Sequence, residues 1–146
     1  MVELIEAKSL IEKYFGSLAA GADIQPVSAP ATPAQAKRIV QKDRVQFPRV
    51  YLAWPTVEET SEDAAALDLL SSILSAGDAS RLEKTLVRDK QMAIQVSTSS
   101  NVNEIGGMFV IDAVAAPQAT IEDIEKQIAD ELDKIRETPP EALRWR

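Results

Sequence analysis

The chain has 146 residues, enough for one domain, and 45% hydrophobic and 27% charged residues are typical of a globular fold. It contains no histidine and no cysteine, which excludes the usual nitrogen and sulfur ligands of zinc, copper or iron and any nucleophile that a histidine activates. The formal net charge of -7 repels phosphate groups and makes a nucleic acid an unfavourable partner.

Neither a membrane span nor a signal peptide is visible in the sequence. No apolar run approaches the roughly 20 residues needed to span a bilayer, and Glu3 and Glu6 replace the basic start of a signal peptide. We therefore expect no membrane partner, while the lack of cysteine leaves the compartment open. A helical pattern begins at once and another begins after Pro139 and Pro140, so we expect a fragment of a longer chain.

The first third of the chain predicts one helix and one strand. Apolar residues at helical spacing predict a helix over Glu3–Phe15, ended by Gly16 in a left-handed conformation. Residues 21–33 contain three prolines, which favour an extended linker. Alternating apolar residues then predict a strand over Ile39–Trp54, interrupted at Pro48 because proline cannot donate to a ladder.

Two helices are predicted in the middle of the chain. Thr60 and Asp63 have the spacing of a capping box before a helix that ends at Gly77. Because this helix is apolar nearly all round, we expect it to be buried. Ser80 and Glu83 repeat the capping spacing and predict a short second helix.

The last third predicts two strands and a helix. Ile94, Val96 and Thr98 share one face of a strand, and a turn leads to a second, more central strand, whose alternating apolar residues are Phe109, Ile111 and Ala113. Thr120 and Asp123 cap a long amphipathic helix ended by the two prolines. The order of elements lacks strand–helix alternation, which favours the α+β class, an antiparallel sheet covered by helices.

The most specific motif is formed by Gly77, Ser80, Arg81 and Leu82. Taken residue by residue, it is a helix stop and an N-cap serine before a short helix. Other motifs accompany it in order: Lys-Tyr-Phe-Gly at 13–16, the strand at 48–55, Leu86-Val87, Gln-Met-Ala at 91–93, and the Gly-Gly strand from 106. Together they resemble the C-terminal lobe of the insulinase and pitrilysin family of zinc metallopeptidases, which includes the mitochondrial processing peptidases and bacterial zinc proteases.

The resemblance implies a single lobe over residues 1–146, with part of the mitochondrial processing peptidase/LuxS-like metallohydrolase fold. In that family zinc is held by a His-x-x-Glu-His helix and a distal Glu in the preceding lobe, and none of these residues is present here. The resemblance therefore implies a non-catalytic structural lobe that lines a substrate chamber, without catalytic residues, metal ligands or a cofactor of its own. The zinc would belong to the parent's preceding lobe.

The partners implied are the zinc-binding lobe, or a partner repeat of the same or a paired chain, and a peptide substrate in the full protein. By the same resemblance, the bacterial periplasm or cytoplasm would be the compartment. We also expect the lobe to self-associate, because its partner would normally cover part of its apolar surface.

Two substrate-binding positions of the family are changed here. The silent repeat of the family often supplies an Arg and, seven residues later, a Tyr near the scissile peptide. These positions are Val87 and Ile94, which cannot make such hydrogen bonds. Arg88 is one position out of register and does not inherit the role, and Glu83 stands where the family commonly has Tyr. The changes favour a lobe that follows a zinc-binding lobe, or a degenerate repeat.

Other interpretations remain open. The chain could be a non-peptidase scaffold or interaction module of the same fold, as in respiratory-complex core subunits, or a small enzyme using only carboxylates and lysines.

Acidic neighbours such as Glu58 and Glu59 could suggest a hard-cation site, but they are expected among 23 acids. The pair Gly106 and Gly107 favours a strand irregularity or close backbone approach over a phosphate loop. Trp54 is expected in the core.

Overall fold

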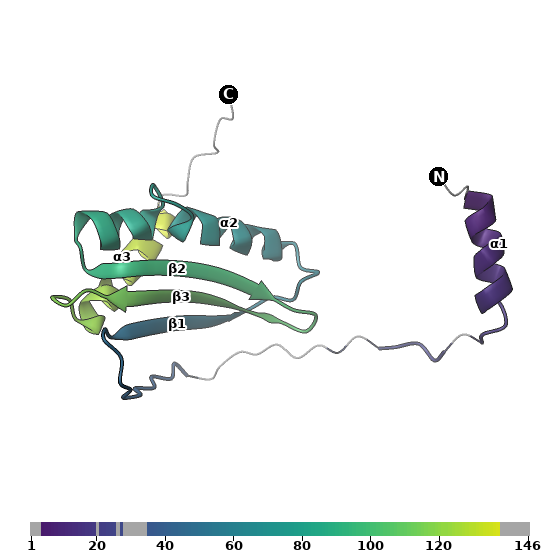
Figure 1. Ribbon diagram of the computed structural model, residues 1–146, viewed down its shortest axis with the longest axis horizontal. Helices are drawn as coiled ribbons and strands as arrows, with labels where there is room; N and C mark the ends of the chain where they lie inside the picture. The colour runs from purple at the N-terminus through teal and green to yellow at the C-terminus, as the bar shows by residue number, and fades with distance from the viewer. Residues whose placement is uncertain (1–3, 20, 26, 28–34, 138–146) are drawn as a thin grey trace, which may run out of the picture.

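The computed structural model describes residues 4–19, 21–25, 27 and 35–137 of the chain (Figure 1). In chain order the elements are α1 (Leu4–Phe15), β1 (Arg49–Thr56), α2 (Asp63–Ser75), the π-helix η1 (Glu83–Asp89), β2 (Ala93–Val102), β3 (Gly107–Ala115) and α3 (Ile121–Glu137). This order is the predicted one, and the α+β class is confirmed.

The three strands form one antiparallel sheet in the order β1-β3-β2, so β3 is central as predicted. Gly107 begins β3 between its two neighbours, opposite Thr56 and Val102. A Cβ atom there would lie 2.6 Å from Thr56 Oγ1 and 2.7 Å from the carbonyl oxygen of Asn101. Since real Cβ atoms do not approach so closely, the strand needs glycine at this position, which is the close backbone approach that the sequence predicts.

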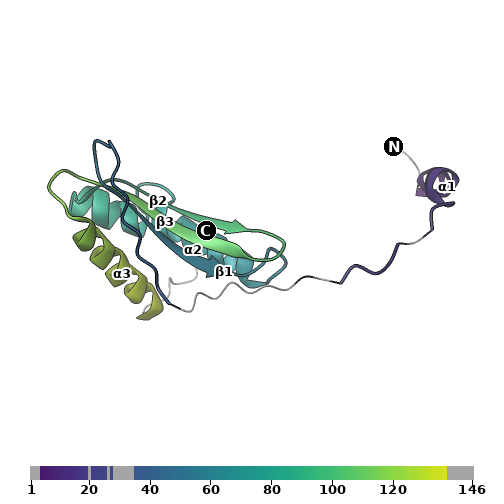
Figure 2. The same ribbon diagram turned by 90° about the horizontal axis from the view of Figure 1, so that it is seen from below.

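One face of the sheet carries the core. On β3 the alternating residues Phe109, Ile111 and Ala113 are buried, as predicted from their spacing. They join one cluster with Ala115 of the same strand and with residues from the rest of the fold: Val50, Leu74, Leu82, Leu86, Ala93, Val96, Ile124 and Ile128. Residues of α2, η1 and α3 therefore cover the same face, and the opposite face has no helix among the described residues. The architecture is two layers (Figures 1 and 2).

The capping box of α3 is confirmed. The backbone N–H of Asp123 donates to Thr120 Oγ1 at 3.1 Å, and the Thr120 hydroxyl donates to Asp123 Oδ2 at 2.6 Å. Ile124 and Ile128 are then buried on the predicted apolar face. The prolines expected to end this helix lie outside the described residues.

The predicted strand over Ile39–Trp54 is wrong in its first half, because β1 begins at Arg49. The amide of Ala115, the last residue of β3, donates to the Pro48 carbonyl at 2.9 Å. β3 therefore offers no further partner to residues 39–47, and apolar residues there stay exposed, such as Val40 at 79%.

The predicted capping box and burial of α2 are also wrong. This helix begins after Glu62 without a side-chain cap, and the amide of Asp63 donates to the Ser61 hydroxyl at 3.3 Å. Only Leu74 is buried in α2, while Leu69 is 58% exposed. The reason is that α2 packs mainly on β2, and no second layer of the described chain covers its outer side.

Three smaller expectations fail as well. Ile94 does not share the face of Val96, because a bulge between Ala93 and Gln95 shifts the alternation. Gly16 is not left-handed, and its amide donates to Glu12 O at 3.0 Å in the helical manner. Trp54 lies at the core-facing side near the end of β1 but stays 41% exposed.

The fully buried Ile111 provides a test of this core. Replacing Ile111→Ala removes apolar contacts at the middle of the central strand and should lower the free energy of unfolding by about 2–5 kcal/mol. The matched control Ile94→Ala, at a residue 48% exposed, should change it by about 0.5 kcal/mol or less. Urea unfolding followed by circular dichroism measures both, and equal effects would contradict the assigned core.

Candidate functional site

The motif of Gly77, Ser80, Arg81 and Leu82 forms the reversal between α2 and η1. Gly77 has φ 86°, the left-handed conformation that glycine adopts without strain. The backbone N–H and the hydroxyl of Ser80 both donate to the Gly77 carbonyl, at 3.1 and 2.7 Å, and Ser80 and Leu82 are buried. The helix η1 begins without a side-chain cap, so the predicted capping box with Glu83 is not formed. The motif closes a tight turn.

The two positions at which the family has Arg and Tyr differ in their burial in this structure. Val87 is on η1 and packs partly buried against the core, whereas Ile94 lies at the bulge of β2 and is 48% exposed. Neither side chain can donate or accept a hydrogen bond. Next to them, Arg88 forms an ion pair with Asp78 across the turn that holds the motif.

The residues do not fit a zinc site. Within residues 4–19, 21–25, 27 and 35–137, no three His, Cys, Asp or Glu side chains could together hold a metal ion. The whole sequence also lacks the imidazole and thiolate ligands that zinc prefers. The described side chains therefore do not provide a ligand set for zinc.

Hydroxyl groups join α2 to the edge strand β2. The amide of Thr98 donates to Ser75 Oγ at 2.9 Å, and the Ser71 hydroxyl donates to the Thr98 carbonyl at 3.0 Å. The Thr98 hydroxyl in turn donates to the Ser71 carbonyl at 2.8 Å and lies 2.6 Å from Ser75 Oγ. The sequence interpretation missed this cluster, although two serines four residues apart in an apolar helix share one face.

A second polar cluster crosses the uncovered face of the sheet. Asp112 of the central strand is only 6% exposed and accepts a hydrogen bond from Arg49 Nε at 2.7 Å. Ser97 of β2 approaches the same carboxylate at 3.5 Å, and the Arg49 guanidinium lies 4.9 Å from the centre of the Tyr51 ring. The hydrogen bond to Asp112 raises the pKa of Arg49 above its ordinary value against the opposing effect of desolvation. These groups connect all three strands.

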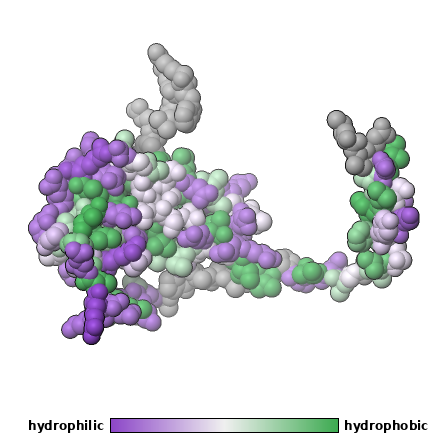
Figure 3. All heavy atoms as spheres, viewed as in Figure 1, coloured by the Kyte–Doolittle hydropathy of each residue, from purple (hydrophilic) through white to green (hydrophobic). Residues whose placement is uncertain are grey.

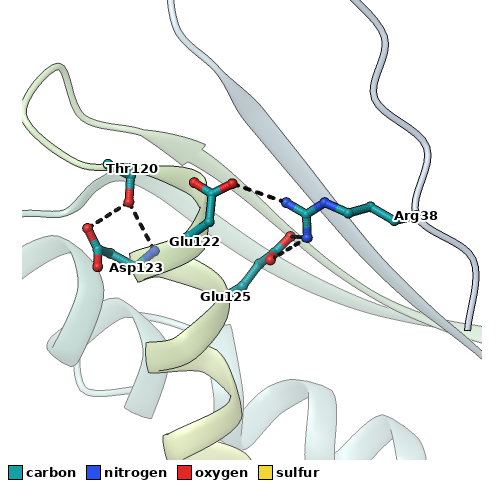
Figure 4. Close-up of polar contacts among 5 residues, drawn as sticks. All are labelled: Arg38, Thr120, Glu122, Asp123 and Glu125. Atoms are coloured by element: carbon teal, nitrogen blue, oxygen red, sulfur yellow. Dashed lines mark hydrogen bonds and ion pairs between the residues drawn. The ribbon is translucent and has the colours of Figure 1, made fainter.

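Arg38 ties the segment before β1 to the start of α3 (Figure 4). Its Nη1 lies 2.7 and 2.9 Å from the two carboxylate oxygens of Glu125, and its Nη2 lies 3.4 Å from Glu122. The hydrogen bond to Glu125 and then the charge of Glu125 raise the pKa of Arg38, with Glu122 adding to the shift. The contact holds a segment of irregular structure beside the helix.

Apolar residues are exposed in two further places on the surface, beside α2 and on α1. An open groove of about 330 Å³ lies beside α2 and is lined by Thr56, Val57, Asp63, Ala66, Leu67 and Leu70. No residue of α1 is buried, and Ile11, Tyr14 and Phe15 are each about 60% exposed. Figures 1 and 3 show α1 apart from the sheet with hydrophobic residues on its surface. Surfaces of this kind mark interaction sites.

In the described part of the chain, an apolar groove and structural ion pairs are present, and no three His, Cys, Asp or Glu side chains could hold a metal ion. These features define an α+β lobe with exposed apolar surfaces. In agreement, the family model of the peptidase M16 inactive domain matches residues 1–144, and the chain belongs to that family. The predicted resemblance to the non-catalytic lobe of these peptidases is confirmed.

Three known proteins are similar to this chain in sequence or in structure. A zinc protease named PqqE from Helicobacter pylori is 30% identical over 98 residues, which cover 67% of this chain and 22% of that protein. The crystal structure of a protease from Helicobacter pylori aligns with a TM-score of 0.69 and 27% identity, over 93% of this chain and 34% of the other. An M16 inactive domain from Pseudomonas fluorescens, 23% identical with a TM-score of 0.56, shares the fold over 63% of this chain and 22% of that one.

The chain thus spans about a third or less of these relatives. No helix of the described ranges is both long and apolar enough to cross a membrane.

The hydroxyl cluster predicts that Ser75 and Ser72 of α2 contribute differently to the free energy of unfolding. Ser75→Ala leaves the amide of Thr98 without its partner and should lower the free energy of unfolding by about 1–3 kcal/mol. Ser72→Ala removes a hydroxyl that is exposed and bonds only within its own helix, so it should cost about 0.5 kcal/mol or less. Thermal or urea unfolding measures the difference, and a larger effect at Ser72 would argue against the cluster.

The contact of Arg38 predicts a change in local protection. Arg38→Gln should speed cleavage by thermolysin before Ile39, Val40 or Val45, because the segment is then no longer held to α3. The neighbouring Lys37→Gln is the control and should leave the rate near that of the wild type. High salt should narrow the difference by screening the exposed ion pairs. Equal cleavage rates for both variants at low salt would show that the contact of Arg38 with α3 does not restrain the segment before β1.

Proposed function

We propose that this chain is the non-catalytic lobe of a zinc-dependent metallopeptidase, packed beside the lobe that carries the zinc and the general base. The observation that carries the proposal is the match to the M16 inactive domain over residues 1–144 in a chain without any histidine or cysteine. The similar zinc protease from Helicobacter pylori supports a zinc-bearing neighbour in the parent protein. The chain's own contribution is shape and contact surface.

The exposed apolar residues support a role in docking. Leu67 and Leu70 of α2 line the groove, and no other layer of the described chain covers it. The helix α1 has 12 residues, which is marginal for an isolated helix in water, and its apolar face is exposed. Both features are stabilised if a neighbouring lobe covers them, since burial of apolar area favours association.

The test combines this chain with the zinc-bearing lobe of its parent protein. Mixing it with the separately produced zinc-bearing lobe of its parent should give cleavage of a fluorogenic peptide that neither part shows alone. Leu67→Glu should reduce that cleavage by about tenfold, because a charge in the groove opposes docking. Leu69→Glu lies two positions away on the exposed side of the same helix and should leave cleavage nearly unchanged.

The controls separate the alternatives. Circular dichroism must show that both variants fold, and zinc analysis of this chain alone should find no stoichiometric metal. Stoichiometric zinc together with cleavage by the isolated chain would contradict the proposal. A parent whose preceding lobe lacks His-x-x-Glu-His and cleaves nothing would favour the scaffold module instead.

A further inference from the structure

The two edges of the sheet differ in what their main-chain groups contact. In an antiparallel pair, residues alternate between those bonded to the neighbour and those whose N–H and C=O point away. The bond from the Ala115 amide to the Pro48 carbonyl fixes this alternation on β1. Val50 and Leu52 therefore bond toward β3, whereas the N–H and C=O groups of Tyr51 and Ala53 point out of the sheet.

The edge of β2 is capped at Thr98 by α2. By the same alternation Thr98 points away from β3, and its amide and carbonyl are bonded to Ser75 and Ser71. On β1 no described residue bonds to the outward main-chain groups of Tyr51 and Ala53. One edge is therefore capped at its middle by helix hydroxyls, and the other is open there.

The middle of the open edge lacks the features that usually prevent strand pairing. Natural edge strands often carry free charges, bulges or prolines. Here the one charged residue of β1 is Arg49, and its charge is paired with Asp112. Pro55 lies only at the far end of the strand. Tyr51, Ala53 and Trp54 are all exposed.

We propose that two copies of this chain pair antiparallel through their β1 edges and form one continuous six-stranded sheet. The register places Tyr51 of each copy opposite Ala53 of the other, so that their outward N–H and C=O groups bond to one another. Leu52 then meets its own equivalent at the two-fold axis, and Trp54 lies opposite Val50 of the second copy. Side chains in such non-bonded positions are close neighbours.

Two observations select a second copy as the occupant. An antiparallel two-fold pair needs a strand that complements itself, and this register covers the exposed core-facing Trp54 while Pro55, which lacks a donor, falls near the end of the ladder. At β2 the same kind of pairing would have to displace the hydrogen bonds between Thr98 and α2, which favours two copies over a longer assembly. The net charge of -7 opposes pairing, so higher salt should tighten the dimer by screening repulsion.

Sedimentation velocity of the chain over a range of concentrations tests the pairing. The wild type should show a monomer–dimer equilibrium. Ala53→Pro removes an outward N–H without taking a bond from β3, and should weaken dimerisation at least about tenfold. Ala53→Ser keeps the N–H at nearly the same side-chain size, and should dimerise like the wild type.

A second variant and a second measurement protect the test against misfolding. If Ala53→Pro does not fold, Ala53→Lys places two like charges near the axis and should also give monomers. Hydrogen exchange at the Tyr51 and Ala53 amides should slow as the concentration rises.

Three results would overturn the proposal. A wild type that is monomeric at every concentration would leave the edge to another strand of the parent or to an extended peptide. A dimer that is insensitive to both variants would place the contact on another surface, such as α1. Open polymers would show that the β2 edge is not closed. None of these results bears on whether the parent is a peptidase.

Discussion

The burial of a single face of β3 is the constraint on which the rest of this structure depends. Phe109, Ile111 and Ala113 supply alternating apolar side chains to the core, and the strand bonds to a neighbour on each side. Because α2 and α3 cover that face only, the opposite face has to be held by polar contacts. The ion pair between Arg49 and the nearly buried Asp112 meets that need across β1 and β3.

What could be predicted from the sequence was local. The alternation of β3 and the capping box of Thr120 and Asp123 depend on residues within a few positions of each other, and both are present. The pairs Arg49–Asp112 and Ser75–Thr98 join positions 63 and 23 residues apart, which no local pattern reveals. The predicted strand before Pro48 failed for the same reason, since a strand needs a partner as well as a pattern.

The functional assignment depends on composition more than on geometry. A lack of histidine and cysteine holds for every arrangement of the chain, so it was visible before any fold was known. The specific motif from Gly77 to Leu82 marked the family, and its atoms form the turn between α2 and η1. Its value for recognition comes from the strict backbone geometry that Gly77 and the buried Ser80 maintain between two helices.

The placement of α2 decides which side of the sheet can grow. An edge amide that lacks a partner loses the free energy of a hydrogen bond, and at Thr98 the helix supplies that partner from two serines. The helix reaches β2 because its one fully buried residue, Leu74, anchors its last turns in the core. No helix side chain bonds to the outward main-chain groups of β1 in the described chain, since α3 contributes apolar residues to the core instead. The asymmetry between the two edges therefore follows from which helix places hydroxyl groups toward the sheet.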